Sequence, residues 1–340
     1  MPEGGAVVSN DTNIYWLARD LATTTRPVRT RTHALSTVTI EVPGSFKDIA
    51  KVGTKTFLLE VDAGVVSLKN GSAPLQPLSL ASSTQWTTAF TSAVPTVNAF
   101  VPSTDGNYLF VVSQGRQAFA VIDTSTMGVV GTLPLTLGPA IMPSAIAYSN
   151  NTVFIGNQTN VEVIDVTTPT APARLTPLTI VPSSVGGVVS GITANAERLA
   201  VAFDPSLAVV ANGAGNGLRV SLFALPTRSF LSSRVLSIRN SQFRLIDGGA
   251  LGLITLAAGP NKNALVVAGK TGANFIEIWY LREEDNLDGN GPQYRVKGRR
   301  LTASSGPVPD TMSVWSSGGR SFVSTRGTDS MLFRSDNCGI

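Results

Sequence analysis

Residues 105–114 read Asp-Gly-Asn-Tyr-Leu-Phe-Val-Val-Ser-Gln, a polar turn that runs straight into a short apolar stretch. Asp-Gly is typical of a tight turn, because glycine adopts left-handed backbone angles without steric cost. The residues that follow are β-branched or aromatic, which favours a strand. Two further apolar stretches come next, at residues 120–126 and 128–135. This part of the chain therefore predicts antiparallel strands joined by short turns.

The same turn and strand recur along the whole chain. The copies start at residues 9, 52, 105, 149, 195, 261 and 318, at intervals of 43 to 66 residues. A four-stranded propeller blade occupies roughly 40–50 residues, so three intervals fit directly and three contain additional residues. We therefore predict an all-β fold in which residues 1–340 form a single β-propeller domain of four-stranded antiparallel blades. Seven blades are predicted, with six as the alternative.

Two details of this prediction concern the ends and the long intervals. Insertions at about residues 226–246 and 283–300 account for the two longest intervals. The last blade is expected to have three strands or to take its fourth strand from residues 1–8. An incomplete blade exposes a sheet edge, which is a natural docking site for another chain. We expect such an edge near residues 331–334.

Residues 99–180 resemble the YVTN-type β-propeller repeats. In that family an Asp-Gly turn leads into one strand, and a second strand ends in Val-Ile-Asp-Thr. The matching residues are Asp105, Gly106, Leu109, Phe110, Val111, Val121, Ile122, Asp123 and Thr124, with a second set at 153–156 and 163–165. The resemblance implies radially packed blades. Such propellers range from surface-layer and binding proteins to lactonase-like enzymes, so the resemblance leaves the function open.

The composition excludes several classes of protein. Hydrophobic residues make up 43% of the chain and charged residues 14%, which excludes a disordered chain. The net charge is +4, which is too small to predict nucleic-acid binding by itself. No signal peptide and no apolar stretch of membrane-spanning length is visible, so no membrane span is expected. A virion or another extracellular particle is favoured over the cytoplasm as the location.

Few residues are available for catalysis. The chain has one cysteine, Cys338, and one histidine, His33, which excludes an intramolecular disulfide, a multi-cysteine zinc site and a histidine cluster. As a general base, His33 would need a nucleophile and an orienting carboxylate. The Gly-x-Ser-x-Gly motif of hydrolases is absent from the sequence. No catalytic residue and no cofactor is therefore predicted.

One segment resembles the start of a calcium-binding loop. Candidate oxygen ligands alternate with other residues at Asn286, Asp288 and Asn290, and Asp285 directly precedes them as a further candidate ligand. An EF-hand loop also needs a bidentate glutamate at its twelfth position, where this chain has Lys297. We therefore interpret the segment as a surface turn rich in Asp-Gly and Asn-Gly, with calcium binding as the alternative.

Asp123 and Asp165 follow equivalent predicted strands. One interpretation is a ring of carboxylates that binds a cation in the central channel. The interpretation we favour is that each carboxylate accepts hydrogen bonds from the backbone of the next turn, as aspartates at strand ends commonly do.

Arginine is the unusual residue of this chain, with 19 arginines against 7 lysines. The arginines gather in two segments, together with the aromatic residues Phe230 and Phe243. Arginine and aromatic residues are enriched in protein interfaces. The candidate interface residues are Arg228, Arg234, Arg239, Arg244, Arg295, Arg299 and Arg300. Solvated loops are the alternative interpretation.

The sequence thus predicts a non-catalytic β-propeller that acts as a structural and protein-interaction subunit of a larger assembly, such as a virion or its tail. Its partners would be other protein subunits. The first alternative is a lactonase-like hydrolytic enzyme, which would need an acidic or metal-binding funnel at the central channel. The second is a secreted carbohydrate-binding propeller, for which aromatic residues should recur between blades.

Overall fold

The computed structural model describes the strands of the chain and most of its middle third. The described residues are 7–9, 13–17, 28–32, 39–42, 46–52, 55–62, 65–70, 77–79, 98–113, 117–126, 128–138, 145–180, 187–205, 218–236, 243–244, 250–255, 263–271, 275–284, 293–302, 311–317, 320–326 and 331–336. Side chains are described for 50, 52, 57, 98–113, 117–126, 128–138, 145–180, 187–204, 218–233 and 265. These ranges contain no helix, and so no helix long and apolar enough to cross a membrane.

The described strands form seven antiparallel sheets, each built from consecutive strands. The first contains β1 (Val7–Ser9), β2 (Asn13–Leu17), β3 (Val28–Thr32) and β4 (Thr39–Val42). The second contains β5 (Phe46–Val52), β6 (Lys55–Asp62), β7 (Val65–Asn70) and β8 (Pro77–Ser79). The third contains β9 (Ala99–Pro102), β10 (Tyr108–Ser113), β11 (Ala118–Asp123) and β12 (Gly128–Pro134).

The other four sheets follow in chain order. The fourth contains β13 (Ile146–Ser149), β14 (Thr152–Asn157), β15 (Asn160–Asp165) and β16 (Ala173–Thr179). The fifth contains β17 (Gly187–Ala194), β18 (Arg198–Pro205), β19 (Leu218–Ala224) and β20 (Phe230–Leu236). The sixth contains β21 (Phe243–Arg244), β22 (Ala250–Thr255), β23 (Asn263–Thr271), β24 (Phe275–Glu284) and β25 (Gln293–Thr302). The seventh contains β26 (Thr311–Ser317), β27 (Arg320–Arg326) and β28 (Met331–Asp336).

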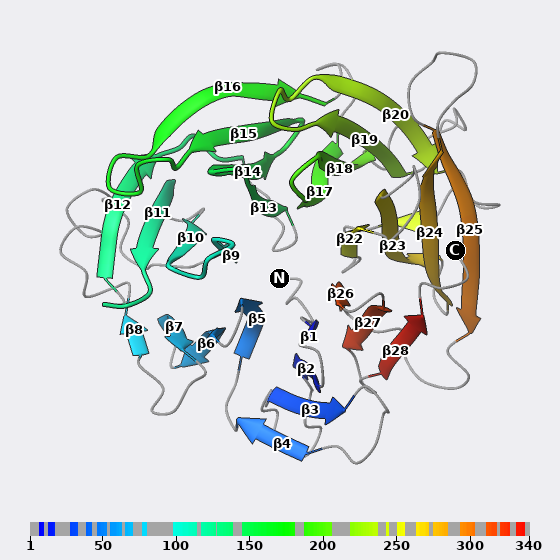
Figure 1. The fold of residues 1–340 in the computed structure, drawn as a ribbon, viewed down its shortest axis with the longest axis horizontal. Helices are drawn as coiled ribbons and strands as arrows, with labels where there is room; N and C mark the ends of the chain where they lie inside the picture. The colour runs from blue at the N-terminus through cyan, green and yellow to red at the C-terminus, as the bar shows by residue number, and fades with distance from the viewer. Residues whose placement is uncertain are drawn as a thin grey trace.

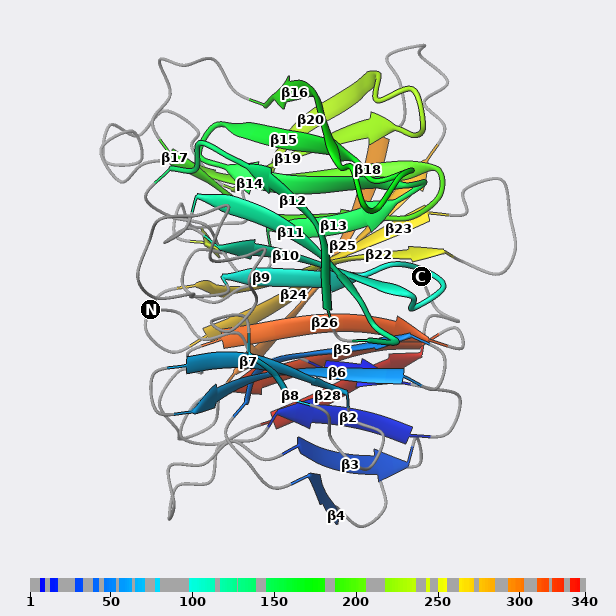
Figure 2. The same cartoon turned by 90° about the vertical axis from the view of Figure 1, so that its left-hand side faces the viewer.

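The sheets follow one another around a common centre, as Figure 1 shows. One strand of each sheet lies nearest the centre, namely β1, β5, β9, β13, β17, β22 and β26. Later strands of each sheet lie progressively farther out, and β12, β16, β20 and β25 lie at the rim. Figure 2 shows the same sheets in a side view, in which the strands of neighbouring sheets lie stacked above one another. This radial arrangement of antiparallel sheets is that of a β-propeller, as the sequence predicts; the number of blades stays a prediction.

The core lies between neighbouring sheets. On β10, Leu109 and Val111 pack against Phe57 of the second sheet, whereas Phe110 and Val112 belong to the core shared with the fourth sheet. Successive side chains of a strand point to opposite faces, so both faces of this sheet are buried. A sheet covered on both faces needs a continuous apolar stretch, which is why the repeat does not alternate. The buried residues of this core include Phe110, Val111, Val121, Ile122, Phe154, Ile155, Val163, Ile164 and Leu265.

The predicted repeat falls in the same place in each sheet. Every predicted turn leads into the strand next to the innermost one, namely β2, β6, β10, β14, β18, β23 and β27. The apolar stretches predicted to follow the turns are β7, β11, β15, β24 and β28. The seventh sheet contains three described strands. Val7–Ser9 pairs with β2 in the first sheet, so the alternative in which these residues complete the last blade is wrong.

Part of each predicted insertion is a regular strand instead of a loop. Within residues 226–246, β20 pairs with β19 from Leu218 opposite Leu236 to Phe223 opposite Phe230. Within residues 283–300, most of the C-terminal half is in β25, which pairs with β24. These parts of the two ranges are therefore regular outer strands, and the two insertions stay a prediction. The outer strand of a blade has one neighbour in its sheet, so its polar, arginine-containing sequence looks like that of a loop.

Candidate functional site

The Asp-Gly turn of the repeat is held by its own side chains. The Asp105 carboxylate accepts hydrogen bonds from Ser103 Oγ (2.6 Å) and from the Asn107 backbone N–H (3.0 Å). Gly106 has a φ of 68°, in the left-handed region that favours glycine. Thr124 Oγ1 donates to the Gly106 carbonyl (2.7 Å) and so joins this turn to the end of β11. The matching residues of the repeat therefore stabilise the blade itself.

Asp123 and Asp165 close the turns that follow β11 and β15. Asp123 Oδ1 accepts hydrogen bonds from the backbone N–H (2.7 Å) and the hydroxyl (2.6 Å) of Ser125. Asp165 Oδ1 accepts one from the Thr167 backbone N–H (2.8 Å). The favoured interpretation, in which these carboxylates cap the next turn, is confirmed.

Two of these carboxylates have lowered pKa values. Hydrogen bonds from the Ser103 hydroxyl and the Asn107 backbone lower the pKa of Asp105, because they stabilise the ionised form. The pKa of Asp165 is lowered by hydrogen bonds from Thr167, with a smaller contribution from the positive charge of Arg228. Both groups are thus stabilised as carboxylates, the protonation state in which they cap their turns.

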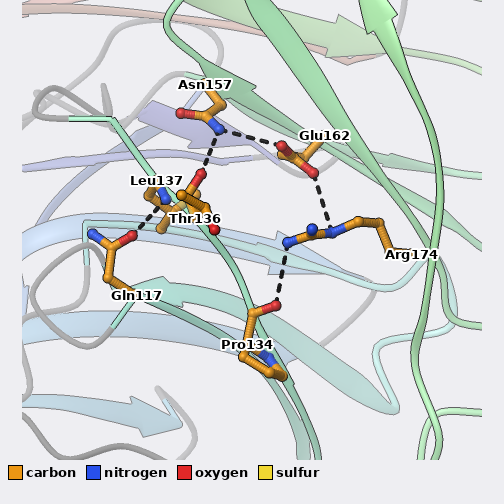
Figure 3. A network of polar contacts seen from close by, with 7 residues as sticks. All are labelled: Gln117, Pro134, Thr136, Leu137, Asn157, Glu162 and Arg174. Carbon is orange, nitrogen blue, oxygen red and sulfur yellow. Dashed lines mark hydrogen bonds and ion pairs between the residues drawn. The ribbon is translucent and has the colours of Figure 1, made fainter.

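A polar network joins the third and fourth sheets (Figure 3). The Glu162 side chain is 11% exposed, and its Oε2 lies 3.5 Å from Nε of Arg174. Arg174 Nη2 donates to the Pro134 carbonyl at the end of β12 (3.3 Å). Asn157 Nδ2 donates to Glu162 Oε1 (3.2 Å) and to the Thr136 carbonyl (2.9 Å). Side chains of the fourth sheet thereby hold the chain that leaves the third.

Two more hydrogen bonds hold residues 135–138, the segment that follows β12. Asn157 Oδ1 accepts a hydrogen bond from the Gly138 backbone N–H (2.8 Å). From the third sheet, Gln117 Oε1 accepts a hydrogen bond from the Leu137 backbone N–H. Glu162, Asn157 and Arg174 thus serve as blade-to-blade ties, and the arrangement leaves neither oxygen of the Glu162 carboxylate without a polar or charged neighbour.

The exposed candidate surface lies at the rim of the fifth sheet. Phe230, the first residue of β20, is 60% exposed. Its ring meets that of Phe223 edge-on, with centroids 5.8 Å apart and an interplanar angle of 75°. Arg228 is half-buried in the turn between β19 and β20, with a φ of 60°. An exposed aromatic ring therefore lies two residues from an arginine on a tight turn.

The other predicted site residues are described only as backbone or not at all. Arg234 lies in β20 and Arg244 in β21, whereas Arg295, Arg299 and Arg300 lie in β25. The outer strands β20 and β25 belong to different sheets that follow one another in the chain, and both lie at the rim in Figure 1. Arg239, His33, Cys338 and the calcium candidates Asp285, Asn286, Asp288 and Asn290 lie outside the described residues. Where the chain is described, no three His, Cys, Asp or Glu side chains are grouped to hold a metal ion.

The sequence interpretation missed the tie between the third and fourth sheets. Glu162 alternates with Val161 and Val163, which are both fully buried. A single acidic residue inside an apolar strand is the signal that was available, because a carboxylate on the covered face of a sheet needs a partner. Its partner Arg174 lies on the next strand, where the sequence shows no comparable pattern.

Comparison with known proteins supports the fold. No protein-family model matches the sequence, and no curated protein matches it. Hydrazine synthase from Kuenenia stuttgartiensis matches in structure with a TM-score of 0.65 and 13% identity, over 98% of this chain and 96% of that one. The chain is a β-propeller.

Two other solved structures show the range of proteins that share this fold. The Pan2 WD40 domain of Neurospora crassa has a TM-score of 0.59 and 11% identity, over 99% of this chain and 90% of that one. The periplasmic gluconolactonase PpgL of Pseudomonas aeruginosa has a TM-score of 0.57 and 13% identity, over 89% of this chain and 86% of that one. Such low identities show the fold alone.

Proposed function

We propose that this propeller is a non-catalytic protein-interaction subunit of a larger assembly, in a setting such as a virion or another extracellular particle. The observation that carries the proposal is the exposed ring of Phe230 beside Arg228 on the rim. Aromatic residues and arginine are enriched at protein interfaces, where a rigid ring buries much area at small cost in side-chain entropy.

The acidic side chains of the third and fourth sheets support a structural role. Asp105, Asp123 and Asp165 cap turns, and Glu162 belongs to the tie between two sheets. A general acid or base must be able to reach a substrate proton. These four carboxylates instead hold their own chain together.

Charge reversal tests the proposal. The fourfold change of Arg228, Arg234, Arg239 and Arg244 to Glu is expected to leave a folded monomer that no longer enters the assembly. The matched control changes the same four residues to Lys, which keeps the charge and is expected to retain assembly. Circular dichroism checks folding, and native mass spectrometry of complexes isolated from the source cells checks assembly. Incorporation of the Glu variant at the level of the parent would overturn the proposal.

The alternative proposal is a lactonase-like enzyme, since a gluconolactonase has the same fold. It requires a catalytic group other than the four carboxylates just named. Hydrolysis of a lactone by the purified chain tests it, and that experiment is described at the end of the Discussion.

A further inference from the structure

The chain from residue 205 to residue 246, which includes the outer two strands of the fifth sheet, contains arginines but no acidic residue. Asp204 and Asp247 flank this interval. Five arginines lie in that interval: Arg219, Arg228, Arg234, Arg239 and Arg244. Three of them are on the β19–β20 hairpin, defined as residues 218–236. Guanidinium groups form strong, often bidentate hydrogen bonds with carboxylates, so the complementary partner of this hairpin is acidic.

The hairpin also presents an edge that can accept another strand. Among the described strands, β20 pairs with β19 alone, so its outer edge has unpaired backbone groups. Two other rim strands differ from β20. The Pro134 carbonyl at the end of β12 accepts a hydrogen bond from Arg174 Nη2, and β16 contains Pro177, which has no N–H to donate. β20 contains no proline.

Two side chains at the start of β20 suit a bound segment. Phe230 offers an exposed ring whose other side rests against Phe223. Arg228 adopts a left-handed backbone conformation, which is unfavourable for residues other than glycine. Within the described part of the chain, its Nη1 is buried and has no hydrogen-bond partner. The charge of Arg228 acts on Asp165 of the fourth sheet, whose pKa it helps to lower, but Nη1 itself has no acceptor. A carboxylate brought close by a partner would supply that acceptor after a small side-chain rotation.

From these observations we infer that the free edge of β20 binds an extended, acidic segment of a partner protein by strand addition. Backbone hydrogen bonds to β20 supply the alignment, an apolar side chain of the segment packs on Phe230, and a carboxylate pairs with Arg228. This inference rests on the proposed function and names the surface and the chemistry of the partner.

A short fluorescent peptide of alternating glutamate and valine is the probe, and fluorescence anisotropy of the full chain measures its binding. Saturable binding that weakens with added salt is expected. Phe230→Ser and Arg228→Gly are each expected to raise the dissociation constant about tenfold, the effect of losing one well-placed contact.

The Arg228→Gly change separates binding from folding. Glycine favours the left-handed backbone angles at this position, so the melting temperature of the variant is expected to equal or exceed that of the parent. Gln158→Gly is the matched control, since Gln158 also has a positive φ (55°) but lies in the turn between β14 and β15. That control is expected to bind the probe as the parent does.

Two modified probes test the mode of binding. The same peptide with alternate backbone amides N-methylated keeps its charges but cannot add as a strand, and is expected to bind at least about tenfold more weakly. Equal binding of the methylated peptide would overturn strand addition. A single-stranded oligonucleotide that bound more tightly than the peptide, and displaced it, would assign the surface to nucleic acid and overturn the inference.

The experiments distinguish failure of the strand-addition inference from failure of the proposed function. If Phe230→Ser and Arg228→Gly chains enter the native complex as the parent does, the chain is an assembly subunit that docks elsewhere, and the β20 edge is not its docking site. If the parent enters no complex and binds no peptide, both proposals fail. Loss of probe binding and of assembly in both variants, with the Gln158→Gly control unaffected, supports the two together.

Discussion

At the scale of single residues, three acidic side chains of the third and fourth sheets, Asp105, Asp123 and Asp165, are engaged in turns. Asp105 shows how: its carboxylate accepts hydrogen bonds from a hydroxyl, a backbone N–H and the Asn107 side chain (2.8 Å). The Asp-Gly motif of the repeat therefore encodes a turn, although an aspartate at such a position resembles a ligand or a catalytic acid in the sequence.

The lowered pKa of Asp105 gives a pH-dependent prediction. Because its pKa is lower in the folded than in the unfolded chain, the carboxylate stabilises the fold above its unfolded pKa, and this contribution is lost as the pH falls through the folded value. Asp105→Asn is expected to lower the free energy of unfolding by about 1 kcal/mol or less at pH 7, since the group is exposed. Urea denaturation of parent and variant measures the difference, which should shrink as the pH falls below the ordinary pKa of an aspartate and through the lowered value of Asp105. A difference independent of pH would contradict this explanation.

The residue scale also shows where the sequence was insufficient. The turn caps were predictable, because an aspartate and the backbone it binds are two or three residues apart. The tie between Glu162 and Arg174 was not, because it depends on which strand lies beside which and on how far a long side chain reaches toward Pro134 of another sheet. Phe230 was noticed in the sequence for its arginine neighbours, but its exposure follows only from the fold.

At the scale of elements, strand β12 shows how one sheet covers the next. A Cβ atom on Gly131 would collide with the Pro169 carbonyl in the turn that follows β15. On Gly128, in the same strand, a Cβ would meet only Thr126 Oγ1, at 3.3 Å. The turn after β15 therefore covers one face of β12 at Gly131, and only a residue without a side chain permits this contact.

The two glycines of β12 make a matched pair for mutation. Gly131→Ala is expected to lower the free energy of unfolding by about 1–3 kcal/mol, because a backbone carbonyl cannot move aside as the end of a side chain can. Gly128→Ala is expected to change it by less than about 0.5 kcal/mol. Urea denaturation of both variants measures the effects. Equal stability of the two would show that the turn after β15 does not pack on β12 as described.

Inner and outer strands differ in how well the sequence identifies them. Strands such as β10 and β14 are buried on both faces, so they appear as continuous apolar stretches and were found. The outer strand β16 is largely exposed, β20 contains polar residues and one arginine, and β25 contains three arginines, so their sequences resemble loops. Their assignment required the pairing partner in space, which is why parts of the predicted insertions are strands.

At the scale of the whole molecule, the repeat predicts the propeller because each sheet buries both faces against its neighbours. The described cores lie between the second and third, third and fourth, and fourth and fifth sheets. A blade alone would leave both faces in water, so turn, strand and apolar stretch must recur until the ring is filled. No periodic sequence pattern indicates the function, because the function depends on single residues at the rim or at the centre of the propeller.

The last prediction separates the two proposed functions. The purified chain is expected to open glucono-δ-lactone no faster than buffer does, because the carboxylates of the third and fourth sheets are engaged in turns and in the tie to Arg174. The measurement is the fall in pH of a weakly buffered solution, with heat-denatured protein as the blank. Should turnover appear, His33→Ala asks whether the single histidine carries it, since a lactonase needs a group that can transfer a proton. Turnover by the parent that His33→Ala abolishes would establish an enzyme and overturn the non-catalytic proposal.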